Sequence, residues 1–145
     1  MSNLLQLEFL APFSEWGWPL VRLVMGVQLA AHGFRKATGG IKDFIPWLES
    51  LKVPAPKVAA VCAMLAELVG GLCIAVGLFT RPAGVAAAFT MAVAIVLAHL
   101  GDARNFGKPE AGAFEYPMLI LAVAIAASLA GGGPVSLDAL LAAAH

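Results

Sequence analysis

Charged residues are scarce in this sequence, and their scarcity excludes a water-soluble globular protein. Of the 145 residues, 12% are charged and 61% are hydrophobic, and the mean hydropathy is +0.88. A soluble domain has about 25% charged and about 45–50% apolar residues. Too few polar side chains are present to cover a particle of this size in water, so we expect one integral membrane domain over residues 1–145.

Redox-active cysteine pairs and nucleotide-binding motifs are also missing. Cys62 and Cys73 lie on one predicted helix, about 16 Å apart along its axis, whereas a disulfide needs Cα atoms within about 7 Å. The sequence has no Cys-x-x-Cys pair, no phosphate-binding glycine loop and no closed metal cage. The basic residues are scattered, so we expect no nucleic-acid partner.

Four apolar segments predict an all-α fold, a four-helix transmembrane bundle. They span about 16–33, 58–78, 82–100 and 116–130, each near the ~17–25 residues that a membrane-spanning helix needs. The stretch IKDFIPWLESL, residues 41–51, forms either a cytoplasmic interfacial helix between the first two spans or an ordered loop with an aromatic anchor. After GGGP at 131–134, Ser136 is a candidate N-cap for a short C-terminal helix.

Basic residues concentrate on one side of the predicted bundle. Seven basic residues follow the first and third spans: Arg35, Lys36, Lys42, Lys52, Lys57, Arg104 and Lys108. The opposite side has only Arg81. Since basic loops stay in the cytoplasm, we expect a bacterial-type inner membrane protein with both termini outside and both long loops in the cytoplasm.

Two ionisable residues, Arg22 and Glu67, fall inside the predicted spans. A charged side chain at the centre of a spanning helix costs about 2.5–3.5 kcal/mol on insertion scales, so each needs a partner. In an antiparallel helix pair with level ends, their Cα atoms would differ in depth by about 6 Å. We therefore predict an Arg22–Glu67 ion pair, which either holds the bundle together or belongs to a functional site.

Glycines near these two residues predict close helix packing. Gly26 and Gly33 lie on one face of the first span. Gly70, Gly71 and Gly77 leave one side of the second span without large side chains. Small residues let transmembrane backbones approach one another, and such faces are also candidates for a homodimer contact.

A second polar group is expected where the spans meet the cytoplasm. His32 and Lys36 end the first span, His99 ends the third, and Glu115 and Tyr116 begin the fourth. Together with Glu67 they could line a cavity between the helices, with polar side chains at its entrance. We take Glu67, His32 and His99 as catalytic candidates; the ligand-binding candidates are Arg22, Gln28, Lys36, Glu115 and Tyr116.

Four stretches, in this order and spacing, carry a likeness to a known family: RLVMGVQLAAHGFRK, ELVGGLCIAVGLFTRPAG, FEYPMLIL and GGGPVSLDALL. Together they resemble the DoxX family of small four-helix membrane proteins, from Arg22 to Leu141. The family takes its name from a subunit of an archaeal thiosulfate:quinone oxidoreductase. The resemblance therefore implies a subunit of a membrane oxidoreductase, linked to a quinone and to sulfur or thiol chemistry.

Two classes of function follow. In the first, a membrane oxidoreductase subunit binds a quinone, His32 or His99 handles protons, and Arg22 and Glu67 orient the head group. A haem held between His32 and His99 is a cofactor that we favour less than a quinone. In the second class, a non-catalytic membrane protein binds or transports a small solute or lipid, or scaffolds a redox-enzyme partner.

Overall fold

A computed structural model describes residues 7–99 and 112–144, and every regular element in these ranges is a helix. The expectation of an all-α chain is confirmed for this part of the sequence. η1 is a 3-10 helix, and η2 and η3 are π-helical segments. In chain order the elements are η1 (Glu8–Phe13), α2 (Ser14–Arg35), η2 (Lys36–Gly40), α3 (Ile41–Ser50), α4 (Pro56–Val76), α5 (Thr80–Ala94), η3 (Ile95–His99), α6 (Gly112–Ala130) and α7 (Leu137–Ala143).

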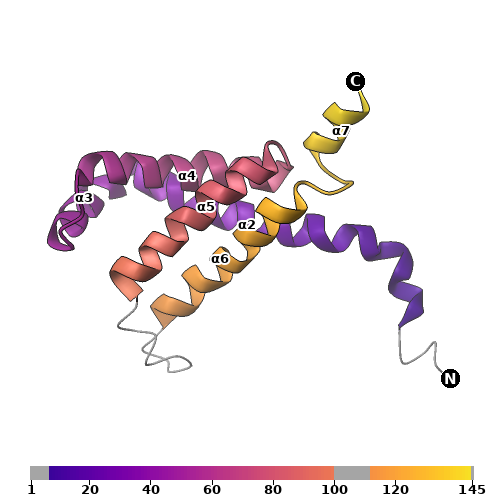
Figure 1. The fold of residues 1–145 in the computed structure, drawn as a ribbon, viewed down its shortest axis with the longest axis horizontal. Helices are drawn as coiled ribbons and strands as arrows, with labels where there is room; N and C mark the ends of the chain where they lie inside the picture. Colours follow the sequence, from indigo (N-terminus) through magenta and orange to yellow (C-terminus); the bar gives the residue numbers. More distant parts are fainter. Residues whose placement is uncertain (1–6, 100–111, 145) are drawn as a thin grey trace.

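The long helices pack as two crossed pairs (Figure 1). Helix α2 runs along α4, and α5 runs along α6; α4 and α5 join the pairs, and α2 also contacts α6. The short helices α3 and α7 lie at opposite ends of α4 (Figure 1). We refer to these as the α3 end and the α7 end of the molecule.

Glycines set the close approach of α2 to α4. A Cβ atom added at Gly26 would lie 2.6 Å from the Gly71 carbonyl oxygen, and one added at Gly71 would lie 2.5 Å from the Ala30 nitrogen. At Gly33 an added Cβ would lie 2.6 Å from the Leu68 Cα atom. The small-residue faces of α2 and α4 therefore cover each other within one chain and leave no free face there for a homodimer.

Gly70 and Gly77 have other surroundings. A Cβ atom at Gly70 would meet the Ala83 carbonyl oxygen at 3.8 Å, which is an ordinary contact. Gly77 ends α4 in the left-handed conformation, with φ 72°, and the Leu78 nitrogen donates to the Cys73 carbonyl oxygen at 2.9 Å. Glycine is the residue that adopts this helix end without strain.

The outer surface is apolar enough to face lipid. In the described part of the chain, two helices are long and apolar enough to cross a membrane, Pro56–Val76 and Thr80–Leu97, and 33% of each is buried. Large apolar side chains on the long helices are 63% to 72% exposed: Leu20, Phe89, Leu119 and Leu129. So much exposed hydrocarbon would be unfavourable in water but suits a membrane.

A kink at Gly39 brings α3 back over the end of α2. Gly39 has φ 139°, a conformation that is strained for any residue with a side chain. Residues 41–50 form a helix, as one of the two sequence interpretations expected, and α3 packs on α4 with Leu48 buried. Phe44 and Trp47 stack at 5.5 Å between ring centroids. The kink thus places Phe44 beside the last residues of α2.

Gly71→Ala tests the close packing of α2 on α4. The added methyl group would push into the backbone of Ala30, and we expect a loss of about 1–3 kcal/mol in unfolding free energy. Gly17→Ala is the matched control, because an added Cβ there meets nothing within 4 Å. Circular dichroism during heating in detergent should show a lower Tm for Gly71→Ala alone. A Tm equal to that of Gly17→Ala would contradict the packing.

Candidate functional site

Arg22 does not meet Glu67, so the predicted ion pair is wrong. The guanidinium of Arg22 donates to the carbonyl oxygens of Ile74 at 2.8 Å and Ala75 at 3.1 Å, both in the last turn of α4. It also donates to the Val135 carbonyl oxygen at 2.7 Å. With 4% of its surface exposed, Arg22 is buried at the α7 end.

The register of α2 against α4 explains the error. Level helix ends would bring Arg22 near Glu67, whereas the glycine contacts place Gly26 beside Gly71 and Gly33 beside Leu68. Arg22 therefore lies beside the last turn of α4, about 10 Å along the axis from Glu67. The last carbonyls of a helix lack intrahelical partners and carry partial negative charge. They stabilise the guanidinium directly, and the carboxylate of Asp138 adds to this by its charge.

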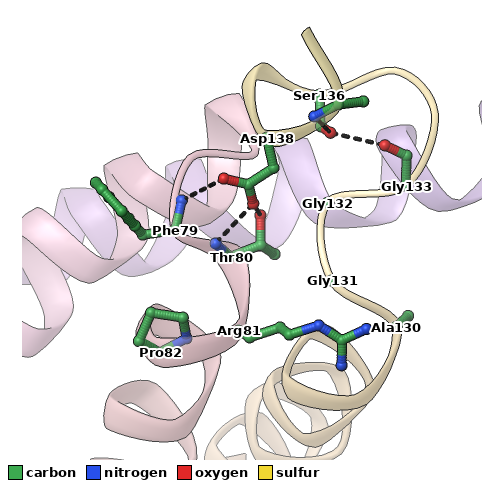
Figure 2. A pocket seen from close by; sticks show the side chains of 11 residues that line it. Phe79, Thr80, Arg81, Pro82, Ala130, Gly131, Gly132, Gly133, Ser136 and Asp138 are labelled. Carbon is green, nitrogen blue, oxygen red and sulfur yellow. Dashed lines mark hydrogen bonds between the residues drawn. The ribbon is translucent and has the colours of Figure 1, made fainter. Parts of the chain in front are cut away.

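Internal hydrogen bonds join the residues that line a pocket of about 420 Å³ at the α7 end. Asp138 accepts from the Phe79 nitrogen at 2.7 Å and from the nitrogen and Oγ1 of Thr80 at 3.0 and 2.8 Å (Figure 2). Arg81 extends toward the end of α6, where it donates to the Leu129 carbonyl oxygen at 2.6 Å. Ser136 caps α7 as expected, accepting from the Ala139 nitrogen at 3.1 Å. We call Arg22, Thr80 and Asp138 the α7 latch, and interpret it as structural.

The latch keeps Asp138 ionised. Partial burial raises the pKa of the Asp138 carboxyl, but hydrogen bonds from Thr80 and Phe79 and the charge of Arg22 outweigh this effect. The net pKa of Asp138 lies below its usual value. A lowered folded-state pKa stabilises the fold at every pH above the unfolded value of about 3.9. This stabilisation is lost as the pH falls through the folded-state value.

Asp138→Asn tests the latch. We expect it to lower the unfolding free energy by about 1–3 kcal/mol at pH 7, since hydrogen bonds to a charged group are lost. Asp43→Asn, at an exposed position on α3, is the matched control. Denaturant titrations in detergent should show the difference between wild type and Asp138→Asn shrinking only below about pH 4. A difference that is absent at pH 7 would refute the latch.

Glu67 pairs with Lys36 at the α3 end. The Lys36 Nζ atom lies 2.5 Å from Glu67 Oε1, and the two side chains are 20% and 6% exposed. Lys36 Nζ also lies 4.2 Å from the centroid of the Phe44 ring, a cation–π contact. Three elements therefore contribute to this group: η2 through Lys36, α3 through Phe44 and α4 through Glu67. Phe44 is not among the site residues predicted from the sequence, where its only signal is its place on the apolar face of α3.

His32 and Tyr116 complete this group from α2 and α6. Their ring centroids lie 5.1 Å apart at an interplanar angle of 36°. His32 also lines one pocket with Lys36, the partner of Glu67. We call His32, Lys36, Glu67 and Tyr116 the α3-end site. The sequence predicted a wider polar group at this level, with His99 and Glu115 included and Glu67 above it, and that grouping stays a prediction.

Two polar atoms of the α3-end site are buried without a partner. Among the described residues, three buried side-chain atoms make no hydrogen bond: Arg22 Nε, Glu67 Oε2 and Tyr116 Oη. The last two belong to this site, and one is an acceptor while the other is a donor. Each such atom costs about 1–3 kcal/mol, which a bound polar group would relieve. Glu67 Oε2 and Tyr116 Oη therefore retain unused hydrogen-bonding capacity at the α3 end.

Two residues of the site, His32 and Lys36, line an open pocket of about 520 Å³ at the α3 end, together with Arg35, Thr38, Gly40 and Phe44. Glu67 and Tyr116 do not line this pocket. His32 is exposed in it.

The other predicted site residues lie apart or outside the description. Gln28 lines an apolar groove between α2 and α6, and Glu115 is half-buried next to Tyr116. His99 ends η3, but its side chain lies outside the described residues, so its predicted role stays a prediction. Within residues 7–99 and 112–144, no three His, Cys, Asp or Glu side chains are grouped to hold a metal ion.

A double-mutant cycle tests the Lys36–Glu67 pair. Removing one partner of a buried pair costs about 3–5 kcal/mol, because the other charge is left uncompensated. We expect Glu67→Gln and Lys36→Met each to lower the unfolding free energy, and the double variant to recover much of the loss. Arg22→Met combined with Glu67→Gln is the control, with effects that add within about 0.5 kcal/mol. Coupling to Arg22 instead of Lys36 would refute the assignment.

Comparisons with known proteins agree on one family. A model of the DoxX family matches residues 17–100. A protein of Bacillus subtilis (strain 168) named "Putative oxidoreductase CatD" is 31% identical over 124 residues, which cover 86% of this chain and 86% of that protein. "Inner membrane protein YphA" of Escherichia coli (strain K12) is 32% identical over 131 residues, 82% of this chain and 86% of that protein. No solved structure matches the chain.

Proposed function

The chain belongs to the DoxX family of membrane proteins, and from this premise we propose that it is the membrane subunit of an oxidoreductase that binds a quinone at the α3-end site. The observation that carries the proposal is the buried Lys36–Glu67 pair with an unpartnered acceptor, Glu67 Oε2, and an unpartnered donor, Tyr116 Oη. A quinone oxygen accepts a hydrogen bond, and the corresponding quinol oxygen donates one. The name of the Bacillus subtilis relative is consistent with a redox role.

Each residue of the α3-end site has a role in this proposal. Tyr116 Oη donates a hydrogen bond to one oxygen of the ring and holds it in place. The ammonium of Lys36 stabilises negative charge on the reduced ring, while Glu67 Oε2 accepts from a ring hydroxyl. His32, exposed in the pocket and in contact with Tyr116, passes protons between water and the site.

The electrons come from outside the chain. Reduction of a quinone to a quinol takes up two electrons and two protons. Oxidation of two thiols to a disulfide on a partner subunit releases two electrons and two protons, so the exchange balances. The two cysteines of this chain are separate, Cys62 exposed and Cys73 half-buried, which is why we place the thiol donor on a partner.

The proposal includes an orientation in the inner membrane. Helices α2, α4, α5 and α6 would form a single four-helix transmembrane domain, with α3 lying on the cytoplasmic surface. Basic residues at the α3 end support this orientation: Arg35, Lys36, Lys42, Lys52 and Lys57. The α3-end site and its open pocket would then face the cytoplasm, where thiols are kept reduced.

Tyr116→Phe tests the proposed head-group contact. The probe is a dimethoxy-methyl-benzoquinone without a side chain, titrated against the full-length protein in nanodiscs. Loss of one hydrogen bond should raise the Kd about tenfold, since such a bond contributes about 1.5 kcal/mol. Thr90→Val, which removes an exposed hydroxyl bonded to the Ala86 carbonyl oxygen, is the matched control.

Two outcomes would contradict the proposal. Wild-type protein that binds no quinone would remove it, and so would equal Kd values for Tyr116→Phe and Thr90→Val. Quinone binding without any quinol formation in thiol-supplied native membranes would favour the non-catalytic alternative, a membrane protein that binds a lipid-like molecule.

A further inference from the structure

We propose that a groove between α2 and α6 holds the apolar chain of the ligand whose head group occupies the α3-end site. The inference rests on the proposed function and adds the substrate class, a quinone with a long hydrocarbon chain rather than a water-soluble one. The lining that carries the argument comes from two helices, and we call it the α2–α6 groove: Leu20, Val24 and Gln28 on α2, and Leu119, Ile120 and Val123 on α6.

The size and chemistry of the groove fit a single chain. Its volume is about 310 Å³, and apart from Gln28 its lining is apolar. Ligand pockets span about 300–1,000 Å³, so this one is at the small end and suits one hydrocarbon chain better than the paired chains of a phospholipid. It opens on an outer face of α2 and α6, where Leu20 and Leu119 are both 63% exposed, so a ligand dissolved in the membrane can enter sideways.

The α2–α6 groove ends about one helical turn from His32 and Tyr116. Leu20, Val24 and Gln28 are spaced four residues apart on α2, and His32 is the next member of this row. On α6, Val123 and Leu119 lead back along the helix to Tyr116. The two rows converge where the His32 and Tyr116 rings lie 5.1 Å apart. The groove and the His32–Tyr116 contact are therefore consecutive stretches of the same faces of α2 and α6.

Gln28 marks the junction between chain and head group. It is exposed in the groove and makes no hydrogen bond to the described residues. An amide without a partner is unfavourable beside hydrocarbon. Gln28 lies one turn before His32, whose ring contacts that of Tyr116, and Tyr116 Oη also lacks a partner. An unpartnered amide at the end of an apolar groove nearest to this hydroxyl matches an amphiphile whose polar end lies there.

Val24→Trp tests the groove, and Val27→Trp is its matched control. Both valines lie on α2 and are 50% and 53% exposed, but Val24 lines the groove whereas Val27 does not. Two probes are titrated in nanodiscs of fixed composition: the chainless benzoquinone and the same ring with a decyl chain. A Trp at position 24 should raise the Kd of the decyl probe at least tenfold and leave the Kd of the chainless probe within twofold. Val27→Trp should change neither.

A crosslinking measurement on wild-type protein adds a test without any substitution in the groove. A decyl probe with a terminal diazirine should label Leu20, Val24 or Val123 on illumination, as read by mass spectrometry, and excess unlabelled decyl probe should abolish the labelling. Gln28→Leu should raise the Kd values of both probes by the same factor, because it acts on the head group and not on the chain.

The outcomes separate this inference from the proposed function. If wild-type protein binds neither probe, both the function and the groove assignment are wrong. If both probes bind but Val24→Trp behaves like Val27→Trp, or if the diazirine labels only other helices, the function stands and the groove assignment is wrong. Labelling that only phospholipid displaces would identify the groove as a lipid site and would also overturn it.

Discussion

The register of α2 against α4 determines which charges meet, and the rest of the structure depends on it. Gly26 and Gly71 let the two backbones approach so closely that no side chain could intervene. Because backbone contacts fix this register, the helices cannot shift to bring opposite charges together. Each charged side chain therefore interacts with the groups that lie opposite it on the neighbouring helix. Arg22 lies opposite the last carbonyls of α4, and Glu67 lies within reach of Lys36. The cost of unpaired charges in a membrane makes both arrangements necessary.

The two ends of the molecule satisfy their polar groups to different degrees. At the α7 end, Asp138 accepts three hydrogen bonds and Arg22 donates three, and Arg22 Nε is the one buried side-chain atom described there that lacks a partner. At the α3 end, Glu67 uses one oxygen and Tyr116 uses none of its hydroxyl capacity. Completed networks stabilise a fold, whereas incomplete buried ones are where ligands bind. This contrast is the reason for placing function at the α3 end.

The sequence was a good guide to the helices and a poor guide to one charge pair. Apolar runs and caps predicted the long helices to within a few residues, and Ser136 was correctly identified as the N-cap of α7. Arg22 was assigned the wrong partner because its acceptors are backbone carbonyls, which no pattern of side chains reveals. The Phe44 contact with Lys36 depends on the kink at Gly39, whose direction is a three-dimensional property. Local signals therefore predicted the elements, and packing decided the partners.

The central claim is that Lys36 holds the buried carboxylate of Glu67. Solid-state NMR of protein in lipid, with ¹⁵N at lysine Nζ and ¹³C at glutamate Cδ, measures this contact directly. The account predicts a strong dipolar coupling between Lys36 Nζ and Glu67 Cδ, in keeping with an Nζ–Oε1 distance of 2.5 Å, and its loss in Glu67→Gln. A coupling of Glu67 Cδ to the guanidinium of Arg22, with none to Lys36, would contradict it.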